Sequence, residues 1–356
     1  MKVLIGEISS YKAIVIARHI FKMYPEVELI AYDNKRPIRR IHTKYVSSCV
    51  YIEKTDLVSY IQKLADFVNS QGIDVFIPVH SDYIGQILYH KEIFGNALDY
   101  LGNYYDYISL HEKNQLMNIA RKSAVRVPKC YKTIESAQVP FVVKPTNKSS
   151  AKGVHYCMTE SDKEKFISET NNDLSHSLCQ EYIAGQGCGY SIYCKDGQIM
   201  QEYGHIRLAE YPISGGSSVY RKGFIHSDMK AVAEKILKKV SWTGFAMFEF
   251  KLTELGELVL IEVNPRIWGS INQALEEGIP FFSNLLWKEQ KPVRQKSNSP
   301  KRTCLSPQVY LSLLLYALKG NVAPLKDFVA HRKFVSKDVS LLKDPKGFVS
   351  MIIRKL

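Results

Sequence analysis

Residues 243–272 read TGFAMFEFKLTELGELVLIEVNPRIWGSIN, and this stretch carries the strongest fold signal in the chain of 356 residues. Two apolar runs, at 244–252 and 258–263, flank a polar turn that contains the dipeptide Leu255-Gly256. Apolar runs separated by a short glycine-containing turn predict a β-hairpin. A symmetric turn centred on this dipeptide pairs residues whose numbers sum to 511.

Three oxygen-bearing side chains are expected to meet on one face of this hairpin. The predicted register pairs Glu254 with Glu257 beside the turn. Further along the strands it pairs Glu249 with Glu262, and Asn264 lies two residues beyond, on the same face. Carboxylates directly opposite each other repel, and a divalent cation removes the repulsion, since Mg²⁺ prefers carboxylate and phosphate oxygens. The alternative is an exposed edge hairpin with solvated glutamates.

The end of the hairpin adds a basic group to these acids. Pro265 ends the strand because it lacks an N–H, and Arg266 then follows the acids directly. An arginine can hold a phosphate or carboxylate through two parallel hydrogen bonds. The order FEFK…LIEVNPRIWGS resembles the metal-binding end of the ATP-grasp ligases. The resemblance implies ATP and Mg²⁺ (with Mn²⁺ as an alternative), the metal ligands Glu249, Glu262 and Asn264, and a catalytic role for Arg266.

A second motif, FVVKPTNKSSAKGV at 141–154, predicts a buried strand that ends near Lys144 and leads into a polar loop. Small residues let backbone N–H groups approach phosphate oxygens, and lysine neutralises their charge. The motif resembles the phosphate-covering loop of the same family. The resemblance implies that Lys144 contacts the α- and β-phosphates and that three loop residues close over the β/γ region: Ser149, Ser150 and Gly153. A plain surface hairpin is the alternative.

Lys113 is a further candidate for contact with the phosphates. It lies in a helix predicted from about Ser109 to Ser123, where a lone lysine would by default be solvated. The helix and the following VPKCY resemble the entry to the ATP-grasp domain. There the lysine at the position of Lys113 reaches the nucleotide phosphates.

The segment LCQEYIAGQGCGYSIY, residues 178–193, resembles the strand and turn behind the adenine in this family. The resemblance implies three nucleotide-binding residues: Gln180, Glu181 and Ile183. Two departures concern the acids of the family pattern. An acid often stands where this chain has Gln180, and a ribose-binding glutamate often stands where it has Gly187 and Cys188.

Basic residues cluster around a glycine turn in QEYGHIRLAEYPISGGSSVYRKGF, residues 201–224. A basic pair beside such a turn suits a developing acyl phosphate. Related ligases carry an arginine in a GGSS segment that helps to hold phosphate or the acid substrate. The resemblance therefore implies Arg221 as the first catalytic candidate and Arg207 as the second. Solvated strand residues are the competing interpretation.

Residues 1–106 alternate strand and helix patterns, which predicts a parallel sheet with right-handed crossovers. The fingerprint G-x-G-x-x-G is absent from the first turn, so a dinucleotide site is not expected there. ATP-grasp proteins resemble this arrangement and often use the domain to bind the second substrate. The strand-end residues His80, Ser81 and Asp82 are candidates for that contact, with helix capping as the favoured alternative.

The composition, 46% hydrophobic and 23% charged, is that of a soluble globular protein of one to three domains. The N-terminus lacks signal-peptide features, and no apolar run reaches the 18–20 or so residues that span a bilayer. Seven scattered cysteines indicate reduced thiols, so a cytoplasmic location is expected. The net charge of +13 indicates an anionic partner such as a nucleotide. Nucleic-acid-binding motifs are absent, so no nucleic-acid partner is expected.

The last part of the chain, 288–356, begins with a basic linker and continues as helical, basic sequence. Docking on the body is the default expectation. Contact with an anionic membrane or a partner is the alternative, and a homodimer is left open.

Together these signals predict an α/β and α+β protein. A Rossmann-like parallel α/β domain at 1–106 precedes a two-lobed ATP-grasp fold at 107–287, whose mobile small lobe spans about 125–185. A helical basic C-terminal tail at 288–356 completes the chain.

The resemblance implies a ligase that phosphorylates a small-molecule carboxylate and joins it to an amine or thiol, releasing ADP and phosphate. Three alternatives stay open. One is carbamoyl-phosphate-type phosphorylation, and another is a non-catalytic nucleotide-binding accessory protein in surface-polysaccharide assembly. The last is a membrane-surface scaffold that uses the basic tail.

Overall fold

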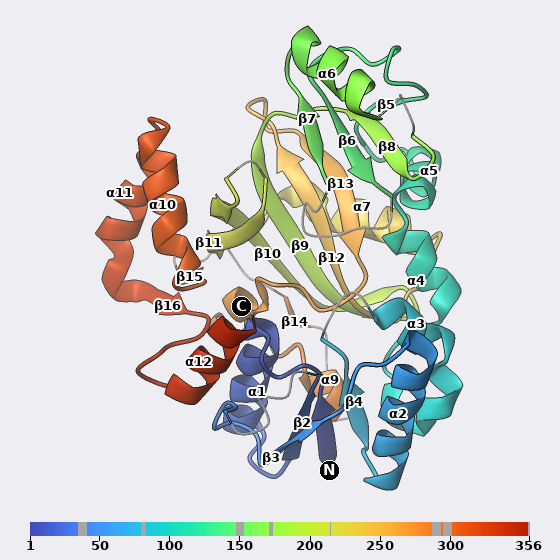
Figure 1. Cartoon of the computed structure of the whole chain (residues 1–356), viewed down its shortest axis with the longest axis vertical. Coiled ribbons are helices and arrows are strands. Elements are labelled where there is room, and N and C mark those ends of the chain that lie inside the picture. The colour runs from blue at the N-terminus through green and yellow to red at the C-terminus, as the bar shows by residue number, and fades with distance from the viewer. Residues whose placement is uncertain are drawn as a thin grey trace.

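The computed structural model describes residues 1–34, 41–79, 83–146, 153–170, 174–213, 215–286, 293–294 and 301–354. Three sheets organise these residues, with helices packed against them (Figure 1). A four-stranded sheet comes from the first 77 residues, a small four-stranded sheet from residues 130–181, and an eight-stranded sheet from the remainder. The predicted α/β and α+β fold is confirmed.

The N-terminal sheet has the order β3-β2-β1-β4, and all its strands are parallel. Its strands are β1 (Lys2–Ile5), β2 (Glu28–Asp33), β3 (Ser48–Tyr51) and β4 (Val75–Ile77), and its crossover helices are α1 (Tyr11–Met23) and α2 (Leu57–Ser70). Ser10 and Asp56 cap these helices, because each side chain accepts a hydrogen bond from a backbone N–H in the first turn. The short strand β3 was not predicted.

Four short helices lead from this sheet toward the next: α3 (Ile84–Tyr89), η2 (Lys91–Leu98), α4 (Tyr104–His111) and α5 (Lys113–Lys122). The prediction of one helix from Ser109 to Ser123 is wrong, because the helix is interrupted at Glu112, which has an extended backbone conformation. The Glu112 side chain accepts a hydrogen bond from the backbone N–H of Gln115 at 2.8 Å and caps α5. Lys113 is therefore the first residue of a new helix.

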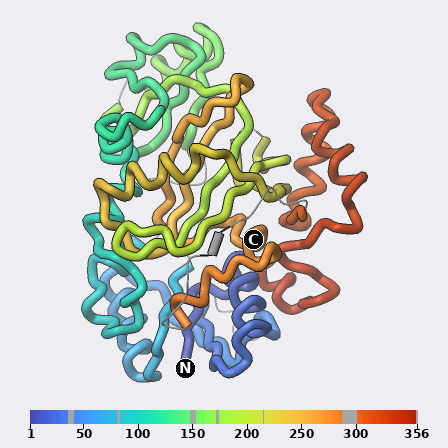
Figure 2. The backbone as a smooth tube through the Cα atoms, turned by 180° about the vertical axis from the view of Figure 1, so that it is seen from behind, coloured from blue at the N-terminus to red at the C-terminus, as the bar shows by residue number. Residues whose placement is uncertain are grey.

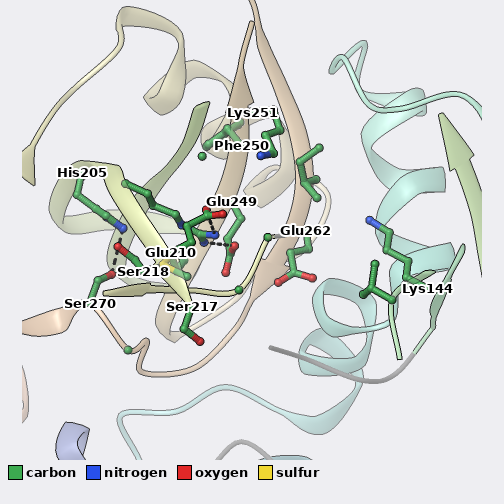
Figure 3. Close-up of a pocket in the computed structure, with 18 of the residues that line it drawn as sticks. Lys144, His205, Glu210, Ser217, Ser218, Glu249, Phe250, Lys251, Glu262 and Ser270 are labelled. Atoms are coloured by element: carbon green, nitrogen blue, oxygen red, sulfur yellow. Dashed lines mark hydrogen bonds and ion pairs between the residues drawn. The ribbon is translucent and has the colours of Figure 1, made fainter. Parts of the chain in front are cut away.

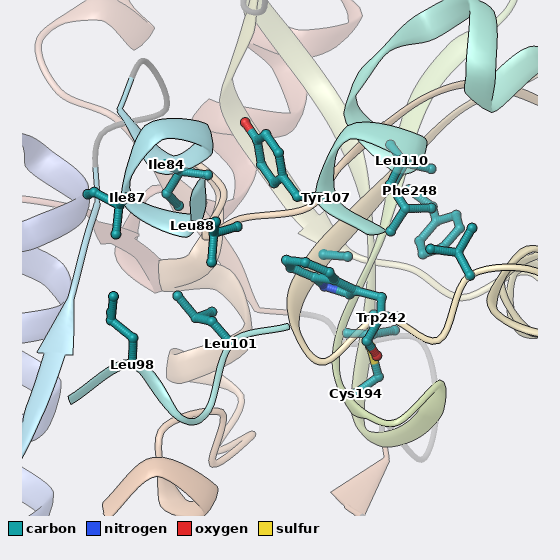
Figure 4. Close-up of a cluster of buried hydrophobic side chains, with 14 of the residues drawn as sticks. Ile84, Ile87, Leu88, Leu98, Leu101, Tyr107, Leu110, Cys194, Trp242 and Phe248 are labelled. Carbon is teal, nitrogen blue, oxygen red and sulfur yellow. The ribbon is translucent and has the colours of Figure 1, made fainter. Parts of the chain in front are cut away.

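A shared apolar core fixes these helices to the large sheet (Figure 4). Trp242 is fully buried there, and its indole N–H donates to the carbonyl of Phe245 at 3.1 Å. Tyr107 and Leu110 of α4 pack into the same cluster as Phe248 of the large sheet. The start of α5 is thus held in place relative to the sheet.

The small sheet is antiparallel, has the order β5-β8-β6-β7 and has its own apolar core. It consists of β5 (Cys130–Tyr131), β6 (Phe141–Pro145), β7 (His155–Cys157) and β8 (Ser177–Glu181), with α6 (Glu160–Thr170) beside it. Its cluster is centred on Phe141 and is separate from the larger cores. This sheet lies at the far end of the molecule from the N-terminal sheet (Figure 1).

The large sheet runs in the order β13-β12-β9-β10-β11-β15-β16, and β14 pairs with β10. Its strands are β9 (Gln186–Lys195), β10 (Gln198–Tyr211), β11 (Ser217–Gly223), β12 (Gly244–Leu252), β13 (Leu258–Asn264), β14 (Val293–Arg294), β15 (Arg302–Cys304) and β16 (Val335–Lys337). Three helices accompany the middle of this segment: α7 (Ser227–Leu237), α8 (Ile271–Glu276) and α9 (Ser283–Leu286).

The predicted β12–β13 hairpin forms, with Glu249 directly opposite Glu262. The predicted pairing of Glu254 with Glu257 is wrong, because the N–H of Thr253 donates to the carbonyl of Glu257 at 3.0 Å. Next to the turn, the strand pairing therefore differs by one residue from the predicted register. A β-bulge at Ile261 adds one residue to β13 and restores the predicted register at the two glutamates.

The C-terminal residues do more than dock on the body, because they extend the large sheet. β15 pairs with β11 and β16 pairs with β15. The helices are α10 (Gln308–Leu318), α11 (Ala323–His331), η3 (Arg332–Phe334) and α12 (Pro345–Ile353). From behind, this segment lies along the sheet edge and reaches back to the N-terminal residues (Figure 2). No helix in the described residues is long and apolar enough to cross a bilayer.

Candidate active site

A cleft of about 1610 Å³ lies where the three sheets and the C-terminal helices meet. The small sheet contributes Lys144 to its lining, and the large sheet contributes Glu249 and Glu262. The N-terminal segment contributes Lys12, and the C-terminal segment contributes Arg354. Residues far apart in the sequence thus share one cleft (Figure 3).

The two opposed glutamates share one amide group. The Asn264 side-chain N–H₂ donates to Glu249 Oε1 at 2.9 Å and to Glu262 Oε1 at 3.0 Å. The oxygen of that amide accepts from Arg266 Nη2 at 2.8 Å. The predicted convergence of Glu249, Glu262 and Asn264 with Arg266 is therefore present.

The two carboxyl groups differ in acidity. Burial raises the pKa of Glu249, and the nearby Glu262 adds to the effect although Arg207 opposes it. Burial also acts on Glu262, but Lys113 and Lys144 outweigh it and lower the pKa of that carboxyl. Such a pair titrates as a unit, and Glu249 is the member that holds a proton more readily.

Two lysines face Glu262 across the cleft. Lys113 Nζ lies 3.9 Å from Glu262 Oε2, and Lys144 points toward Glu262 from the small sheet (Figure 3). Burial lowers the pKa of Lys144 to about 8, and the like charge of Lys113 adds to the effect while Glu262 opposes it. Cations thus come from α5 and β6, and anions from β12 and β13.

Arg207 connects the acids to the next strand. Its guanidinium pairs with Glu249 and, at 3.1 Å, with Glu210 Oε1. Although burial opposes its charge, these two carboxylates raise the pKa of Arg207. Arg207 and Glu210 both line the cleft.

The family model for the ATP-grasp domain matches residues 110–270. This range contains the cleft residues described above: Lys113, Lys144, Glu249, Glu262, Arg207 and Arg266. Residues 110–270 form an ATP-grasp domain.

The chain is also similar to known ligases in sequence and in structure. D-alanine–D-alanine ligase of Fusobacterium nucleatum is 24% identical over 165 residues, which are 43% of this chain and 55% of that enzyme. The match thus spans about half the length of that relative.

Two solved structures share the fold at low sequence identity. One is the biotin carboxylase domain of Hydrogenobacter thermophilus 2-oxoglutarate carboxylase, in complex with MgADP, ADP and bicarbonate, with a TM-score of 0.67, 13% identity and coverage of 85% of this chain and 73% of that one. The other is L-amino acid ligase of Bacillus licheniformis, with a TM-score of 0.61, 16% identity and coverage of 82% and 75%.

The nucleotide-binding candidates of the ATP-grasp domain lie on the small-sheet side of the cleft. Gln180 is buried at the end of β8, and within the described structure its Oε1 has no hydrogen-bond partner. Ile183 and Glu181 also line the cleft, but the Glu181 carboxylate accepts from the backbone N–H of Lys129 at 3.1 Å. The Gln180 amide is therefore the polar side chain best placed to receive a ligand there.

Several predicted residues lie outside the described residues: Ser149, Ser150, His80, Ser81 and Asp82. Gly153 is described and adopts a left-handed backbone conformation (φ +74°), beside the cleft-lining Val154. An added Cβ at Gly153 would approach Pro145 Cγ to 3.1 Å, so this turn favours glycine.

Arg221 does not line the cleft, so the prediction that it contacts phosphate is wrong. Arg221 is fully buried and forms an ion pair with the equally buried Asp338. Its Nη1 also donates to the carbonyl of Ser218 at 3.2 Å. Arg221 is opposite Arg207 on the neighbouring strand, but the partner that draws it away lies 117 residues later in the chain.

One buried polar contact at the cleft wall was not identified by the sequence analysis. Ser270 Oγ lies 3.1 Å from His205 Nε2 at the cleft wall. Burial lowers the pKa of His205 well below its usual range, so the ring is neutral. An added Cβ at Gly189 would lie 2.5 Å from the His205 ring, so the glycine makes room for it. A histidine two residues before Arg207 on the same strand was the available signal.

Glu210 was likewise not identified from the sequence. Its Oε1 would lie 2.8 Å from a Cβ at Gly187, and Arg207 Cδ would lie 2.9 Å away. The absence of a side chain at Gly187 thus leaves the room that Glu210 and Arg207 occupy. The available signal was that the family's acid is absent at Gly187. A replacement acid on the neighbouring strand was the residue to look for.

Proposed function

We propose that the protein is an ADP-forming, ATP-dependent ligase. It transfers the γ-phosphoryl group of ATP to the oxygen of a substrate carboxylate, and an amine (or thiol) then displaces phosphate from the acyl phosphate. The observation that carries this proposal is the opposition of Lys113 and Lys144 to Glu249 and Glu262 across the cleft of an ATP-grasp domain. Phosphoryl transfer depends on such positioning and charge compensation.

The acid pair suits Mg²⁺ or Mn²⁺. Glu249 and Glu262 would be ligands, and the oxygen of Asn264 would join them once its amide turns over, because its N–H₂ now faces both carboxylates and its oxygen accepts from Arg266. In the described part of the chain, no three His, Cys, Asp or Glu side chains form a metal cage by themselves. Mg²⁺ tolerates this, because phosphate oxygens and water complete its shell. When bound, the metal offsets charge on the phosphates.

The nucleotide lies between the sheets in this proposal. Lys113 and Lys144 hold the phosphates, and the loop residues Ser149, Ser150 and Gly153 cover them. A second group of residues holds the base: Gln180, Glu181 and Ile183. The MgADP of the Hydrogenobacter carboxylase domain, which shares this fold, supports ATP with a divalent metal.

The acid substrate would bind in the part of the cleft lined by Arg207 and Arg266. Arg266 and Arg207 steady its carboxylate and the acyl phosphate, because both line the cleft beside the two glutamates. The neutral His205 and the Ser270 hydroxyl offer hydrogen bonds to a polar substrate group. No side-chain nucleophile takes part, since binding and electrostatics suffice for this chemistry.

The test is ADP release from Mg-ATP in the presence of pooled amino acids, dipeptides and sugar acids. Glu262→Gln should reduce substrate-dependent ADP release by about 100-fold or more, because a carboxylate ligand for the metal that offsets the phosphate charge would be lost. Glu254→Gln is the matched control, because Glu254 is an exposed glutamate in the turn of the same hairpin.

Each outcome of this test has a distinct meaning. Substrate-dependent release that fails in Glu262→Gln and persists in Glu254→Gln supports the ligase and begins to identify its acid. Tight Mg-ATP binding without release from any pool favours an acid substrate outside the pools or a nucleotide-binding accessory protein. An absence of Mg-ATP binding contradicts both functions.

The chain is divided in this proposal as follows. Residues 1–106 help to bind the second substrate, and residues 107–287 carry the nucleotide chemistry with a mobile small lobe at about 125–185. In the C-terminal region 288–356, cleft-lining residues such as Tyr316, Asp327 and Arg354 contribute to substrate binding. A cytoplasmic location accords with cysteines that are all free in the structure. The partners are a small-molecule carboxylate and an amine, and a homodimer remains open to measurement.

A further inference from the structure

Exposed apolar side chains concentrate in the C-terminal segment. The described residues expose twenty-one large apolar side chains, and eleven of these belong to the 54 residues from 301 to 354. They are Tyr310, Leu311, Leu314, Leu318, Val322, Leu325, Val329, Phe334, Leu341, Leu342 and Val349. Such a concentration on one part of a surface marks an interaction site.

Helix geometry collects part of this set into stripes. Leu311, Leu314 and Leu318 are 45%, 55% and 74% exposed, and their spacing places them on one side of α10. The opposite side of α10, with Val309 and Leu313, packs into the core beside β11. The exposed leucines thus form a regular outward face.

The neighbouring helix continues the apolar surface. Leu325 and Val329 are exposed one turn apart on α11, which packs against α10 through the Tyr310–Phe328 ring contact at 6.0 Å. Figures 1 and 2 show both helices at the edge of the molecule, beside the large sheet. We refer to α10, α11 and η3, residues 308–334, as the C-terminal arm.

Charge around the arm has one sign. The exposed charged residues of the segment 301–354 are all basic: Lys301, Lys319, Lys326, Arg332, Lys333, Lys337, Lys343 and Lys346. Its three acids are turned inward. Asp338 pairs with the buried Arg221, Asp344 caps α12, and Asp327 binds Arg302 at 2.7 Å. Four of the basic residues, Lys319, Lys326, Arg332 and Lys333, belong to the arm, which therefore carries exposed cations and exposed aliphatic groups.

We propose that the C-terminal arm binds the surface of an anionic phospholipid membrane. Aliphatic side chains on α10 and α11 enter the boundary between headgroups and acyl chains, while lysine and arginine stems extend to the lipid phosphates. Each basic residue near such a surface adds electrostatic attraction. A second copy of the chain is a poorer occupant, because a two-fold contact through this face would bring like charges together.

Sedimentation with vesicles tests this inference and does not depend on the proposed ligase activity. The full chain should sediment with phosphatidylcholine vesicles that contain phosphatidylserine, should sediment several-fold less with phosphatidylcholine alone, and should be released by salt. Leu314→Glu/Leu318→Glu should lower the partition coefficient about tenfold or more. Arg332→Glu/Lys333→Glu should have a similar effect, because two cations become anions.

Control variants on other helices distinguish a specific role of the arm from a general effect of protein charge on vesicle binding. Val58→Glu introduces a charge at a 66% exposed apolar residue of α2, and Lys63→Glu/Lys235→Glu reverses the same charge at two exposed lysines of other helices. Both should bind vesicles like the wild type, and circular dichroism should show all variants folded. Equal loss in these controls would contradict a specific role of the arm.

Two further results would overturn the proposal. One is a failure of the wild type to bind anionic vesicles, or equal binding to neutral ones. The other is a dimer in light scattering that Leu314→Glu/Leu318→Glu converts to a monomer, with no vesicle binding. In that case a second copy covers the leucines.

Discussion

At the nucleotide end of the cleft, groups of like charge lie next to each other as well as next to opposite charges, whereas at the N-terminal end a buried acid pairs directly with one arginine. Glu249 and Glu262 oppose each other on adjacent strands, and Lys144 lies near Lys113. At the other end, Arg354 of the C-terminal helix pairs with the buried Glu7 of the first sheet. The first end retains repulsion between like charges that a bound ligand can relieve, while at the second end the fold itself pairs the buried acid.

The comparison predicts opposite consequences for charge removal at the two ends. A balanced buried pair contributes to folding, so loss of one partner leaves a charge in a place that water cannot reach. A concentration of like charge opposes folding, so its relief is tolerated while ligand binding is lost. Stability and activity should therefore separate by location in the cleft.

The largest effect is expected at a balanced buried pair outside the cleft, Arg221–Asp338. Asp338→Ala leaves a guanidinium that cannot lose its proton, and the free energy of unfolding should fall by about 3–5 kcal/mol in urea denaturation. Arg221→Met should cost less, because burial already raises the pKa of Asp338 and the acid can take up a proton. Removing both, as Arg221→Met/Asp338→Leu, should recover most of the loss.

A surface pair provides the control for that prediction. Lys165 and Glu169 lie 3.8 Å apart on the exposed face of α6, and Glu169→Ala should cost less than about 0.5 kcal/mol. An Asp338→Ala variant as stable as Glu169→Ala would show that the C-terminal segment does not depend on this pair.

The second-largest effect is expected at Lys144, the buried lysine at the nucleotide end of the cleft. Lys144→Met should weaken Mg-ATP binding by about 30-fold, roughly 2 kcal/mol, in isothermal titration calorimetry, with little loss of stability. Its pKa of about 8 means that the free protein loses this charge as the pH rises through 8. Bound phosphate favours the charged form, so ATP binding near pH 8.5 should take up protons.

Buffers of different ionisation enthalpy measure that proton uptake directly. Wild-type binding heats should depend on the buffer, and the dependence should disappear in Lys144→Met. Lys165→Met, at an exposed lysine of α6, should behave like the wild type. Unchanged proton uptake in Lys144→Met would assign the proton to another group.

The two ends also differ in how much the sequence could predict. The hairpin and its Glu249–Glu262 pair follow from local alternation, because strand partners there are separated by one short turn. The bulge at Ile261 could not be predicted, because a symmetric turn was assumed and no sequence pattern marks the extra residue. The predicted register was correct at the glutamates only because this extra residue compensates for the turn.

Arg221 illustrates the opposite situation. The residues around it gave the same signal as those around Arg207, a basic residue beside a glycine turn. Asp338, which fixes its position, comes from β16 and the C-terminal segment, and no local pattern connects them. Sequence reasoning thus located the acid pair within a hairpin and failed where a distant segment supplies the partner.

The smallest effect is expected at Glu210, which separates two roles within the nucleotide end. Glu210→Gln keeps the size of the side chain beside Gly187 and removes one of the two carboxylates that pair with Arg207. Arg207 keeps Glu249, so the loss should be about 1 kcal/mol, or roughly fivefold. If Glu210 replaces the acid missing at Gly187, the KM for ATP should rise while kcat is retained. A fall in kcat at constant KM would show instead that Glu210 acts through Arg207 on the transferred phosphoryl group.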